Sequence, residues 1–340
     1  MRKIASIIFT LLLQYTTYCQ TESVNRQQFF LDERTIDVTL TTDIKKLRTE
    51  KKAPAWQPAK IMMRFSDTAT ITEDIRLQPR GEFRKMNCDM ASLMLNFKNP
   101  GSPKLSELKK LKLVGGCSSN FSDEELLLKE YLVYKTYNII SNMSFRVRLM
   151  HITYKDVQGK TKPYTQYAFL IEDLKDLGKR NNCVEANKKI LNPASINRQH
   201  ATLVCMFQYM IGNTDWSLPN FHNIKMIVPK TDTLAPCYLV PYDFDYTGIV
   251  DARYAVAQEQ FGTTSIKERV YRGPPRNLVE VEETITIFKE KKERIMYYIN
   301  NFPLLAARTK KMMTSYLEEF YKTISNKSSS LREIFNAQNK

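Results

Sequence analysis

The chain has few of the residues that build metal sites and phosphate-binding loops. Its 340 residues include three histidines, six cysteines and ten glycines. His151, His200 and His222 stand far apart and no two cysteines form a CxxC pair, so we expect no structural zinc site. No G-x-G-x-x-G or Walker sequence is present, which excludes both of these glycine-rich phosphate loops.

Two classes of hydrolase are also excluded. The chain has no G-x-S-x-G elbow, which a Ser-His-Asp hydrolase of the α/β type needs. Asp243-Phe-Asp245-Tyr-Thr247 follows an apolar segment, as the nucleophile motif of haloacid-dehalogenase phosphatases does. Those enzymes need further acidic metal ligands downstream, but no aspartate follows Asp251, so we discard this interpretation.

Long apolar runs are absent beyond the first residues. Arg2 and Lys3 precede an apolar run at 4–13 and a polar run at 14–20, which is the layout of a cleaved secretory signal. The apolar run has about half the length of a membrane helix. A buried N-terminal helix is the alternative, and lipid attachment at Cys19 is disfavoured because small residues do not precede it. We therefore expect an exported bacterial protein, periplasmic or extracellular, with no transmembrane segment after signal cleavage.

The formal net charge of +15 could favour nucleic acid, anionic lipid or phosphate ligands. Most basic residues, however, stand in runs of mixed sign such as 289–294, which are typical of solvated helix faces. No basic stretch alternates with aromatic residues as in proteins that bind single strands. We therefore expect no nucleic-acid partner.

The cysteines predict one disulfide. Without Cys19 five remain, an odd number that leaves at least one unpaired. Export permits disulfides. Cys88 and Cys117 flank two strands predicted to be neighbours and are the expected pair, whereas Cys205 lies in an apolar helix and is expected to be a core thiol.

Alternation of apolar and polar residues predicts a strand-rich first half. The expected strands are 35–40, 60–65, 70–78, 92–97, 111–114, 145–154 and 164–171. One helix interrupts them, with Ser122 and Glu125 as a predicted capping box. The second half is mostly helical, with helices expected at 195–211, 282–300 and 304–324 and short strands at 222–228 and 237–241.

These patterns predict an α+β chain in four parts. They are a signal peptide over 1–20, a strand-rich region with one helix over 21–172, a helical region over 173–325 and a polar tail over 326–340. No internal repeat or low-complexity linker occurs, so we expect the two large regions to be joined closely.

The stretch 211–250 holds the polar residues that best indicate chemistry. An aspartate in a loop, an asparagine a few residues later, a β-hairpin and another aspartate follow one another, an order found in phosphotransfer sites. There the first aspartate positions or deprotonates the attacking hydroxyl, and the later asparagine and aspartate hold magnesium. A structural loop network is the alternative.

The individual candidates in this stretch follow from spacing. Asp215 is the expected catalytic residue. Asn220 follows it at the interval of the Asp-x-x-x-x-Asn kinase loop, whereas Asn223 directly precedes an apolar strand, so both remain candidates. With Asp243 and Asp245 they form the expected ligand set for Mg²⁺ or Mn²⁺.

Upstream residues could bind the nucleotide. A strand lysine held by a helix glutamate contacts the phosphates in kinases, and Lys112 with Glu130 fits that plan, although Lys109, Lys110 and Lys129 are rivals. We also expect arginines of Arg80-Gly-Glu-Phe-Arg84, Arg80 first, to meet phosphate. Glu172 falls where a hinge backbone could bind adenine, or it simply starts a helix. The basic stretch 267–273 could reach phosphate or form a surface turn.

The motifs GNTDWS, with His222-Asn223 nearby, and PYDFDYTG resemble the core of CotH-type kinase-like proteins, the spore-coat kinases and their secreted relatives. The loop is also similar to that of HipA-type kinases, which reads Gly-Asn-x-Asp. RGEFR, LKLVGGC, KEYLVYKTYN and FLIED look similar to blocks in exported bacterial proteins of this kind. The resemblance runs from about residue 60 to 275 and is firmest over 211–248.

This resemblance implies a two-lobed protein-kinase-like fold, with a strand-rich N-lobe and a mainly helical C-lobe. It also implies Mg²⁺-dependent transfer of a phosphoryl group from ATP to a protein acceptor. Asp215 would be the catalytic aspartate, and Asn220 or Asn223 would hold the metal with Asp243. A kinase-like scaffold or binding protein of the cell envelope, without catalysis, is the alternative.

Overall fold

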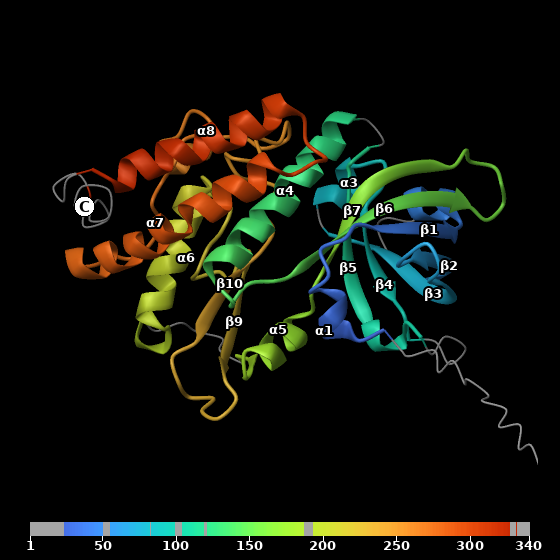
Figure 1. Ribbon diagram of the computed structural model, residues 1–340, viewed down its shortest axis with the longest axis horizontal. Coiled ribbons are helices and arrows are strands. Elements are labelled where there is room, and N and C mark those ends of the chain that lie inside the picture. The colour runs from blue at the N-terminus through green and yellow to red at the C-terminus, as the bar shows by residue number, and fades with distance from the viewer. Residues whose placement is uncertain are drawn as a thin grey trace, which may run out of the picture.

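The computed structural model describes residues 24–49, 55–81, 83–98, 104–118, 121–186, 193–326 and residue 331. The predicted signal peptide and most of the predicted polar tail lie outside the described residues. Figure 1 shows most of the strands at one end of the molecule and the long C-terminal helices at the other.

Seven strands of the first half form a closed barrel in the order β1-β2-β3-β4-β5-β7-β6. β1 and β6 pair in parallel, with Ile36 opposite Met150, and the other barrel pairs are antiparallel. Closure leaves these strands without an open edge. The strands are β1 (Ile36–Thr42), β2 (Gln57–Arg64), β3 (Thr70–Arg80), β4 (Ser92–Asn96), β5 (Lys110–Gly115), β6 (Val147–Asp156) and β7 (Tyr164–Ile171).

The α+β class agrees with the structure, but the predicted two-lobed protein-kinase-like architecture is wrong. The strand-rich half is a closed barrel, and its closure depends on the pairing of β1 with β6. Alternation with period two shows which face of a strand is buried, as in β2, where alternate residues are buried. This alternation does not show which strands, distant in the sequence, pair with each other. It therefore does not predict that β1 pairs with β6 and closes the barrel.

Helices accompany the barrel. The predicted long helix is α4 (Phe121–Ile140), and three short helices add to it: α1 (Arg26–Phe29), α2 (Ile44–Thr49) and α3 (Phe83–Asn87). A 3₁₀ turn covers Ser106–Leu108. Helix α4 begins at Phe121, one residue before Ser122, the residue predicted to cap it.

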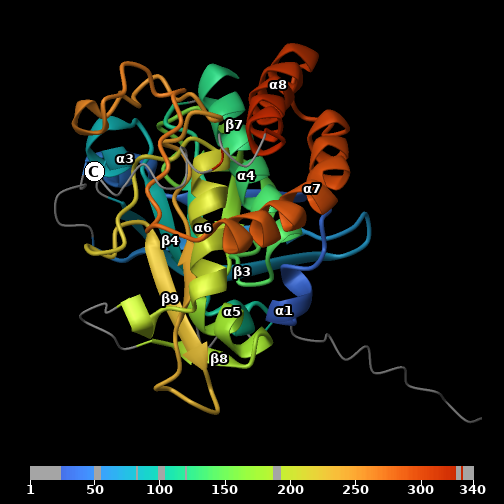
Figure 2. The same ribbon diagram turned by 90° about the vertical axis from the view of Figure 1, so that its left-hand side faces the viewer.

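In the described part of the second half, helices accompany a small antiparallel sheet in the order β10-β9-β8. Its elements are α5 (Leu174–Arg180), β8 (Cys183–Glu185), α6 (Arg198–Met210), β9 (Ile224–Pro229), β10 (Tyr238–Pro241), α7 (Leu278–Asn300) and α8 (Ala307–Ile324), with 3₁₀ turns at Pro193–Ser195 and Glu259–Phe261. A capping box between Asn277 and Glu280 begins α7. Figure 2 shows α6 in front of the barrel strands, with α7 and α8 beside it.

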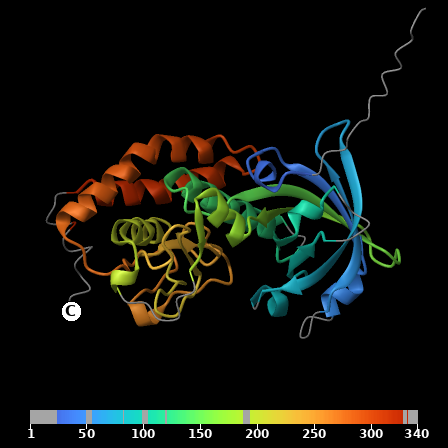
Figure 3. The same ribbon diagram turned by 90° about the horizontal axis from the view of Figure 1, so that it is seen from below.

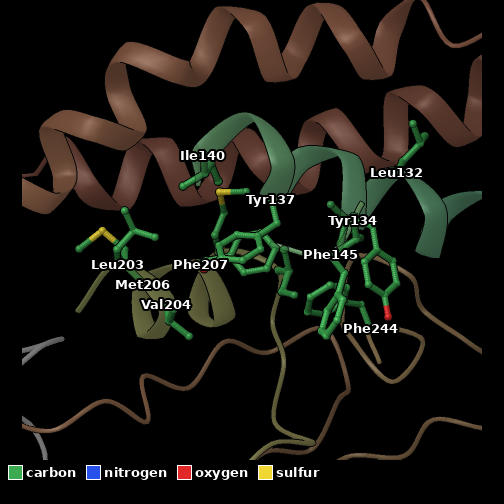
Figure 4. Close-up of a cluster of buried hydrophobic side chains, with 14 of the residues drawn as sticks. Leu132, Tyr134, Tyr137, Ile140, Phe145, Leu203, Val204, Met206, Phe207 and Phe244 are labelled. Atoms are coloured by element: carbon green, nitrogen blue, oxygen red, sulfur yellow. The ribbon is translucent and has the colours of Figure 1, made fainter. Parts of the chain in front are cut away.

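Helix α4 joins the two halves through a shared core. One continuous cluster of buried residues includes side chains of α4, β7, α6, β9, α7 and α8. Within it the rings of Tyr137 and Phe207 have centroids 4.4 Å apart, and those of Tyr134 and Phe244 are 4.6 Å apart (Figure 4). Figure 3 shows α4 between the barrel and the C-terminal helices. The polar loops near Phe244 are thereby anchored to the same helix as the barrel.

The predicted disulfide between Cys88 and Cys117 is confirmed. Within the described residues, Cys183, Cys205 and Cys237 are buried and take no part in a disulfide, which agrees with the expectation for Cys205. In the part of the chain that the structure describes, no helix is both long and apolar enough to cross a membrane.

Candidate active site

A cavity of about 570 Å³ lies between the barrel and the loops next to β9 and β10. The barrel and α3 contribute basic side chains, and the loops contribute acidic ones. Most of the residues predicted to carry chemistry meet here. The cavity is lined by Arg80, Gly81, Arg84, Ser92, Lys112, Val114, Tyr134, Phe145, Ile171, Asp215, His222, Asn223, Tyr242, Asp243, Asp245, Tyr246, Tyr254 and Gln258.

The loop that carries Asp215 is held by hydrogen bonds to Asn213 in the same loop and by hydrogen bonds from Arg272. The Asp215 amide donates to Asn213 Oδ1 (2.8 Å), and the Asn213 side chain donates in turn to Gln208 Oε1 of α6 (2.9 Å). From outside, Arg272 Nη1 donates to the carbonyl oxygens of Thr214 (2.8 Å) and Trp216, one on each side of Asp215. Asp215 is therefore fixed by its backbone, which leaves its carboxylate to face the cavity.

Both carboxylate oxygens of Asp215 have partners. His222 Nε2 lies 3.0 Å from Oδ1, and Asn223 Nδ2 donates to Oδ2 (3.1 Å) and to the Asp215 carbonyl (2.7 Å). Asn223 is buried and has a positive φ of 54°, a conformation that asparagine tolerates better than most residues. Its amide nitrogen donates to Asp215, so its oxygen remains as the atom that could bind a cation.

A direct link joins the Asp215 loop to the loop that follows β10. Gly248 N–H donates to the Gly212 carbonyl (3.0 Å), and Ile249 N–H donates to that of Ile211 (3.2 Å). Gly212 has φ +63°, and a Cβ atom there would lie 2.0 Å from the Tyr316 hydroxyl. Only glycine fits this position without strain. The separation between the two loops is therefore set by backbone contacts.

Asp243 lies in the loop that follows β10 and lines the cavity. Its backbone N–H donates to the Tyr134 hydroxyl of α4 (2.9 Å), and its φ is +65°. Burial among protein atoms raises the pKa of its carboxyl to about 6, and the Asp245 carboxylate adds to the rise while Arg84 and Arg80 oppose it. A cation at this position would relieve the repulsion between the two carboxylates.

Arg84 joins three acidic or polar groups at one side of the cavity. Its guanidinium donates to Glu130 (2.8 Å), to Asp245 (3.1 Å) and to the Gly115 carbonyl (2.8 Å). Glu130 is only 1% exposed, so burial raises the pKa of its carboxyl, and the charge of Arg84 opposes this rise. Among the described residues, Arg84 is therefore the ion-pair partner of Glu130, in place of the predicted Lys112.

Lys112 instead belongs to a group of cations. Burial lowers its pKa, and Arg80 and Lys225 lower it further. Its Nζ lies 5.5 Å from the centroid of the Tyr242 ring, and Lys225 Nζ lies 5.8 Å from the same centroid. Within the described ranges, none of these three cations forms an ion pair with a carboxylate. They form a positive region that faces the acidic loops.

Besides Glu130, two further predicted residues, Glu172 and Asn220, do not line the cavity. Glu172 forms a bidentate pair with Arg180 (2.9 and 3.0 Å) and accepts from the Arg146 amide (3.0 Å), which indicates a structural role for its side chain. Asn220 is exposed in a turn, where its amide donates to Ser217 Oγ (3.4 Å). Of the two candidate asparagines, Asn223 is therefore the one that reaches the cavity.

The basic side chains of the stretch 267–273 contact protein groups next to the cavity. Arg272 holds the Asp215 loop, and its guanidinium lies 4.1 Å from the centroid of Phe261. Arg269 lies 3.7 Å from the ring centroid of Tyr316. Lys267 pairs with Asp251 (2.8 Å). These contacts occupy the basic side chains with protein groups, so they favour neither of the two predicted roles, phosphate contact or a free surface turn.

Sequence reasoning missed several lining residues, of which Tyr254 and Gln258 are examples. Tyr254 and Gln258 belong to no motif. Only the fold brings them to the cavity.

The donor set at this cavity fits a hard divalent cation. Asp243 supplies a carboxylate and Asn223 an amide oxygen, and magnesium commonly binds one or two carboxylates together with substrate phosphates. In the described part of the chain, no group of three or more His, Cys, Asp or Glu side chains is arranged to hold a metal. A cation here would therefore depend on ligands from a bound phosphate compound.

Comparison with known proteins gives little beyond this geometry. No family model matches the chain, and no curated protein matches it. Among solved structures, the Helicobacter pylori proinflammatory kinase CtkA is similar over 74% of this chain and 93% of that chain, with 8% sequence identity and a TM-score of 0.40. The resemblance to CotH-type proteins stays a prediction, and the function has to be inferred from the side chains of the cavity.

Proposed function

We propose that this chain is an exported phosphotransferase that transfers a phosphoryl group from a nucleoside triphosphate such as ATP to a protein acceptor, with Mg²⁺ or Mn²⁺. The observation that supports this most is the composition of one cavity. Asp215, Asn223 and Asp243 supply oxygen atoms on its loop side, and Arg80 and Lys112 supply positive charge on its barrel side. A metal–triphosphate complex needs both kinds of group.

Each residue has a role in this proposal. Arg80 and Lys112 bind the phosphates, and the buried apolar side chains of Val114, Phe145 and Ile171 line the wall available to a base. Asp243 and the Asn223 oxygen would hold the metal, which offsets phosphate charge when bound.

The acceptor hydroxyl would bind at Asp215. The Asp215 carboxylate would orient that hydroxyl and take its proton as the hydroxyl oxygen attacks the terminal phosphorus, while the bond from this phosphorus to the bridging oxygen breaks and the nucleoside diphosphate leaves. His222 and Asn223 hold the carboxylate in place, one at each oxygen. This gives Asp215 and Asp243 separate functions although they face one cavity.

Labelled ATP with Mg²⁺ or Mn²⁺ and a casein-like acceptor tests the proposal. We expect phosphoryl transfer by the protein with its disulfide intact. The transfer rate should fall about 100-fold or more in Asp215→Asn and Asp243→Ala, because each substitution removes a group that acts in the transfer. Asp67→Asn, an exposed aspartate in the β2–β3 turn, is the matched control and should transfer normally.

The melting temperature separates the outcomes. A rise with ATP and metal but no transfer would favour the alternative, a binding or scaffold protein of the cell envelope without catalysis. Neither transfer nor a ligand-dependent rise in the wild-type protein would overturn the proposed function.

A further inference from the structure

Asp243 and Asp245 are two residues apart, but their carboxylates have different surroundings. Asp245 Oδ2 accepts from Arg84 (3.1 Å) and from the Tyr254 hydroxyl (2.8 Å). Its side chain is 17% exposed. The Asp243 carboxylate has no ion pair or hydrogen bond with the described residues, although it lines the same cavity. One carboxylate is therefore held by protein groups and the other is open.

We infer that Arg84 is a positioning residue that keeps Asp245 out of the metal-ligand set and leaves Asp243 as the carboxylate that binds the cation. This rests on the proposed function, and it differs from the sequence-based assignment of Asp245 as a ligand. Both donors contact Oδ2, so binding a cation through that oxygen would break two hydrogen bonds, and the positive charge of Arg84 repels a cation at either oxygen of Asp245. Asp243 has no such cost.

The second contact of Arg84 explains why it stays in place. Its guanidinium, with the side chain 13% exposed, also pairs with the buried Glu130 of α4. Removing a guanidinium from a buried carboxylate is costly, so Arg84 is held at this point by Glu130. Asp245 therefore pairs with a guanidinium whose position Glu130 already sets. This pair sets the direction in which the Asp245 carboxylate points.

The Cys88–Cys117 disulfide completes the arrangement. Arg84 lies on α3, which has only five residues and cannot be stable alone. Cys88 directly follows α3, and its bridge to Cys117 ties α3 to the end of β5, where the carbonyl of Gly115, the last residue of that strand, accepts from Arg84. The Asp89 amide also donates to the Cys117 carbonyl (3.0 Å). The bridge therefore limits where Arg84 can move.

Binding of Mn²⁺ alone tests the role of Arg84 without requiring activity. We expect Arg84→Gln to bind Mn²⁺ roughly threefold to tenfold more tightly, because a positive charge is removed and Asp245 is released toward the cation. Phosphoryl transfer should nevertheless fall, since the ligand set is changed. Arg64→Gln, which removes an exposed arginine paired with Asp37 on the barrel, is the matched control and should change neither quantity.

A double-mutant cycle decides whether Arg84 acts through Asp245. In an Asp245→Asn background, the effect of Arg84→Gln on Mn²⁺ affinity should shrink to less than about half. An equal effect in both backgrounds would overturn the inference, as would Arg84→Gln binding Mn²⁺ as weakly as Asp243→Asn. If Arg84→Gln folds poorly, Asp245→Asn can be tested alone, because this substitution leaves both members of the Arg84–Glu130 pair in place.

Hydrogen exchange provides a readout that needs no ligand. In Arg84→Gln we expect faster exchange in residues 83–89 and 244–248, and in Cys88→Ser/Cys117→Ser faster exchange in the same two segments. Unchanged exchange at 244–248 in both variants would overturn the positioning role. Wild-type protein that binds Mn²⁺ but transfers nothing would contradict the proposed function alone, so the two failures are distinguishable.

Discussion

His222 Nε2 lies 3.0 Å from Oδ1 of Asp215, and both residues line the cavity. We expect His222→Ala to lower phosphoryl transfer roughly tenfold, because one of the two groups that orient the Asp215 carboxylate is lost. The melting temperature should hardly change, since the His222 side chain is 54% exposed. His151→Ala is the control, because His151 is also half-exposed and lies 3.3 Å from Asp37 on the barrel. Equal transfer rates in the two variants would refute a role for His222.

Arg272 should matter for stability and for transfer together. Its guanidinium donates to carbonyls on both sides of Asp215, and hydrogen bonds from charged groups each contribute about 1.5–3 kcal/mol, so we expect Arg272→Met to lose at least about 2 kcal/mol. Arg198→Met breaks an exposed pair with Glu280 and should cost under about 1 kcal/mol. Urea unfolding measures both values. A similar small loss in the two variants would contradict the supporting role of Arg272.

Gly212 is expected to be essential for the spacing of the two active-site loops. Gly212→Ala places a Cβ atom 2.0 Å from the Tyr316 hydroxyl at positive φ, whereas Gly262→Ala at φ +74° meets no atom within 4 Å. The second variant should cost only about 1 kcal/mol, the cost of the left-handed backbone, and the first clearly more. Adding Tyr316→Phe should recover part of the loss in Gly212→Ala. Equal unfolding free energies for the two alanine variants would show that the contact is harmless.

His200 should make the protein sensitive to acid. Burial lowers its pKa from 6.5 to about 4, and its Nδ1 has no hydrogen-bond partner among the described residues. The unfolded chain therefore takes up a proton as pH falls from 6.5 toward 4 while the folded protein does not. His200 therefore does not reduce the free energy of unfolding above pH 6.5, and it reduces it by up to about 3 kcal/mol as the pH falls to 4.

The comparison for His200 is the slope of stability against pH. Urea unfolding at pH 7, 5.5 and 4.5 should show a smaller decrease in His200→Gln than in the wild type, because other groups titrate equally in both proteins. Parallel curves for the two proteins would mean that His200 titrates normally when folded.

The disulfide should contribute strongly to stability. The Cys88–Cys117 bridge spans 29 positions, and loop-closure entropy for a loop of this size corresponds to about 3–4 kcal/mol. We expect Cys88→Ser/Cys117→Ser to lose about this amount in urea unfolding. Adding a reductant should lower the stability of the wild type but not that of the variant. Mass spectrometry without reduction checks the pairing, and a peptide linking Cys88 to a different cysteine would contradict it.

Much of the local structure was predictable because local structure depends on neighbouring residues. The strand predicted at 164–171 is observed as Tyr164–Ile171, since alternation is a property of consecutive side chains. The order of Asp215, Asn223 and Asp243 around a hairpin was likewise visible, and so was the pairing of Cys88 with Cys117. Each of these inferences uses short spacings or adjacent strands.

Partners distant in the chain were not predictable in the same way. Glu130 was expected to meet Lys112 but pairs with Arg84, because the position of α3 depends on the disulfide and on the barrel. Asn220 has the spacing of a known motif, but the turn carries it outward while Asn223 reaches Asp215. Spacing predicts that two residues are near each other, but not which way each one points.

The sequence by itself determined the α+β composition, most strands and helices, the disulfide and the acidic residues of the loops. The tertiary structure alone decided that the strands close into a barrel through β1 and β6, and that Arg84 divides the neighbouring Asp243 and Asp245 into an open and a held carboxylate. The physical reason is that hydrophobic periodicity and spacing act within a few residues. Barrel closure and buried ion pairs instead depend on which distant surfaces exclude water together.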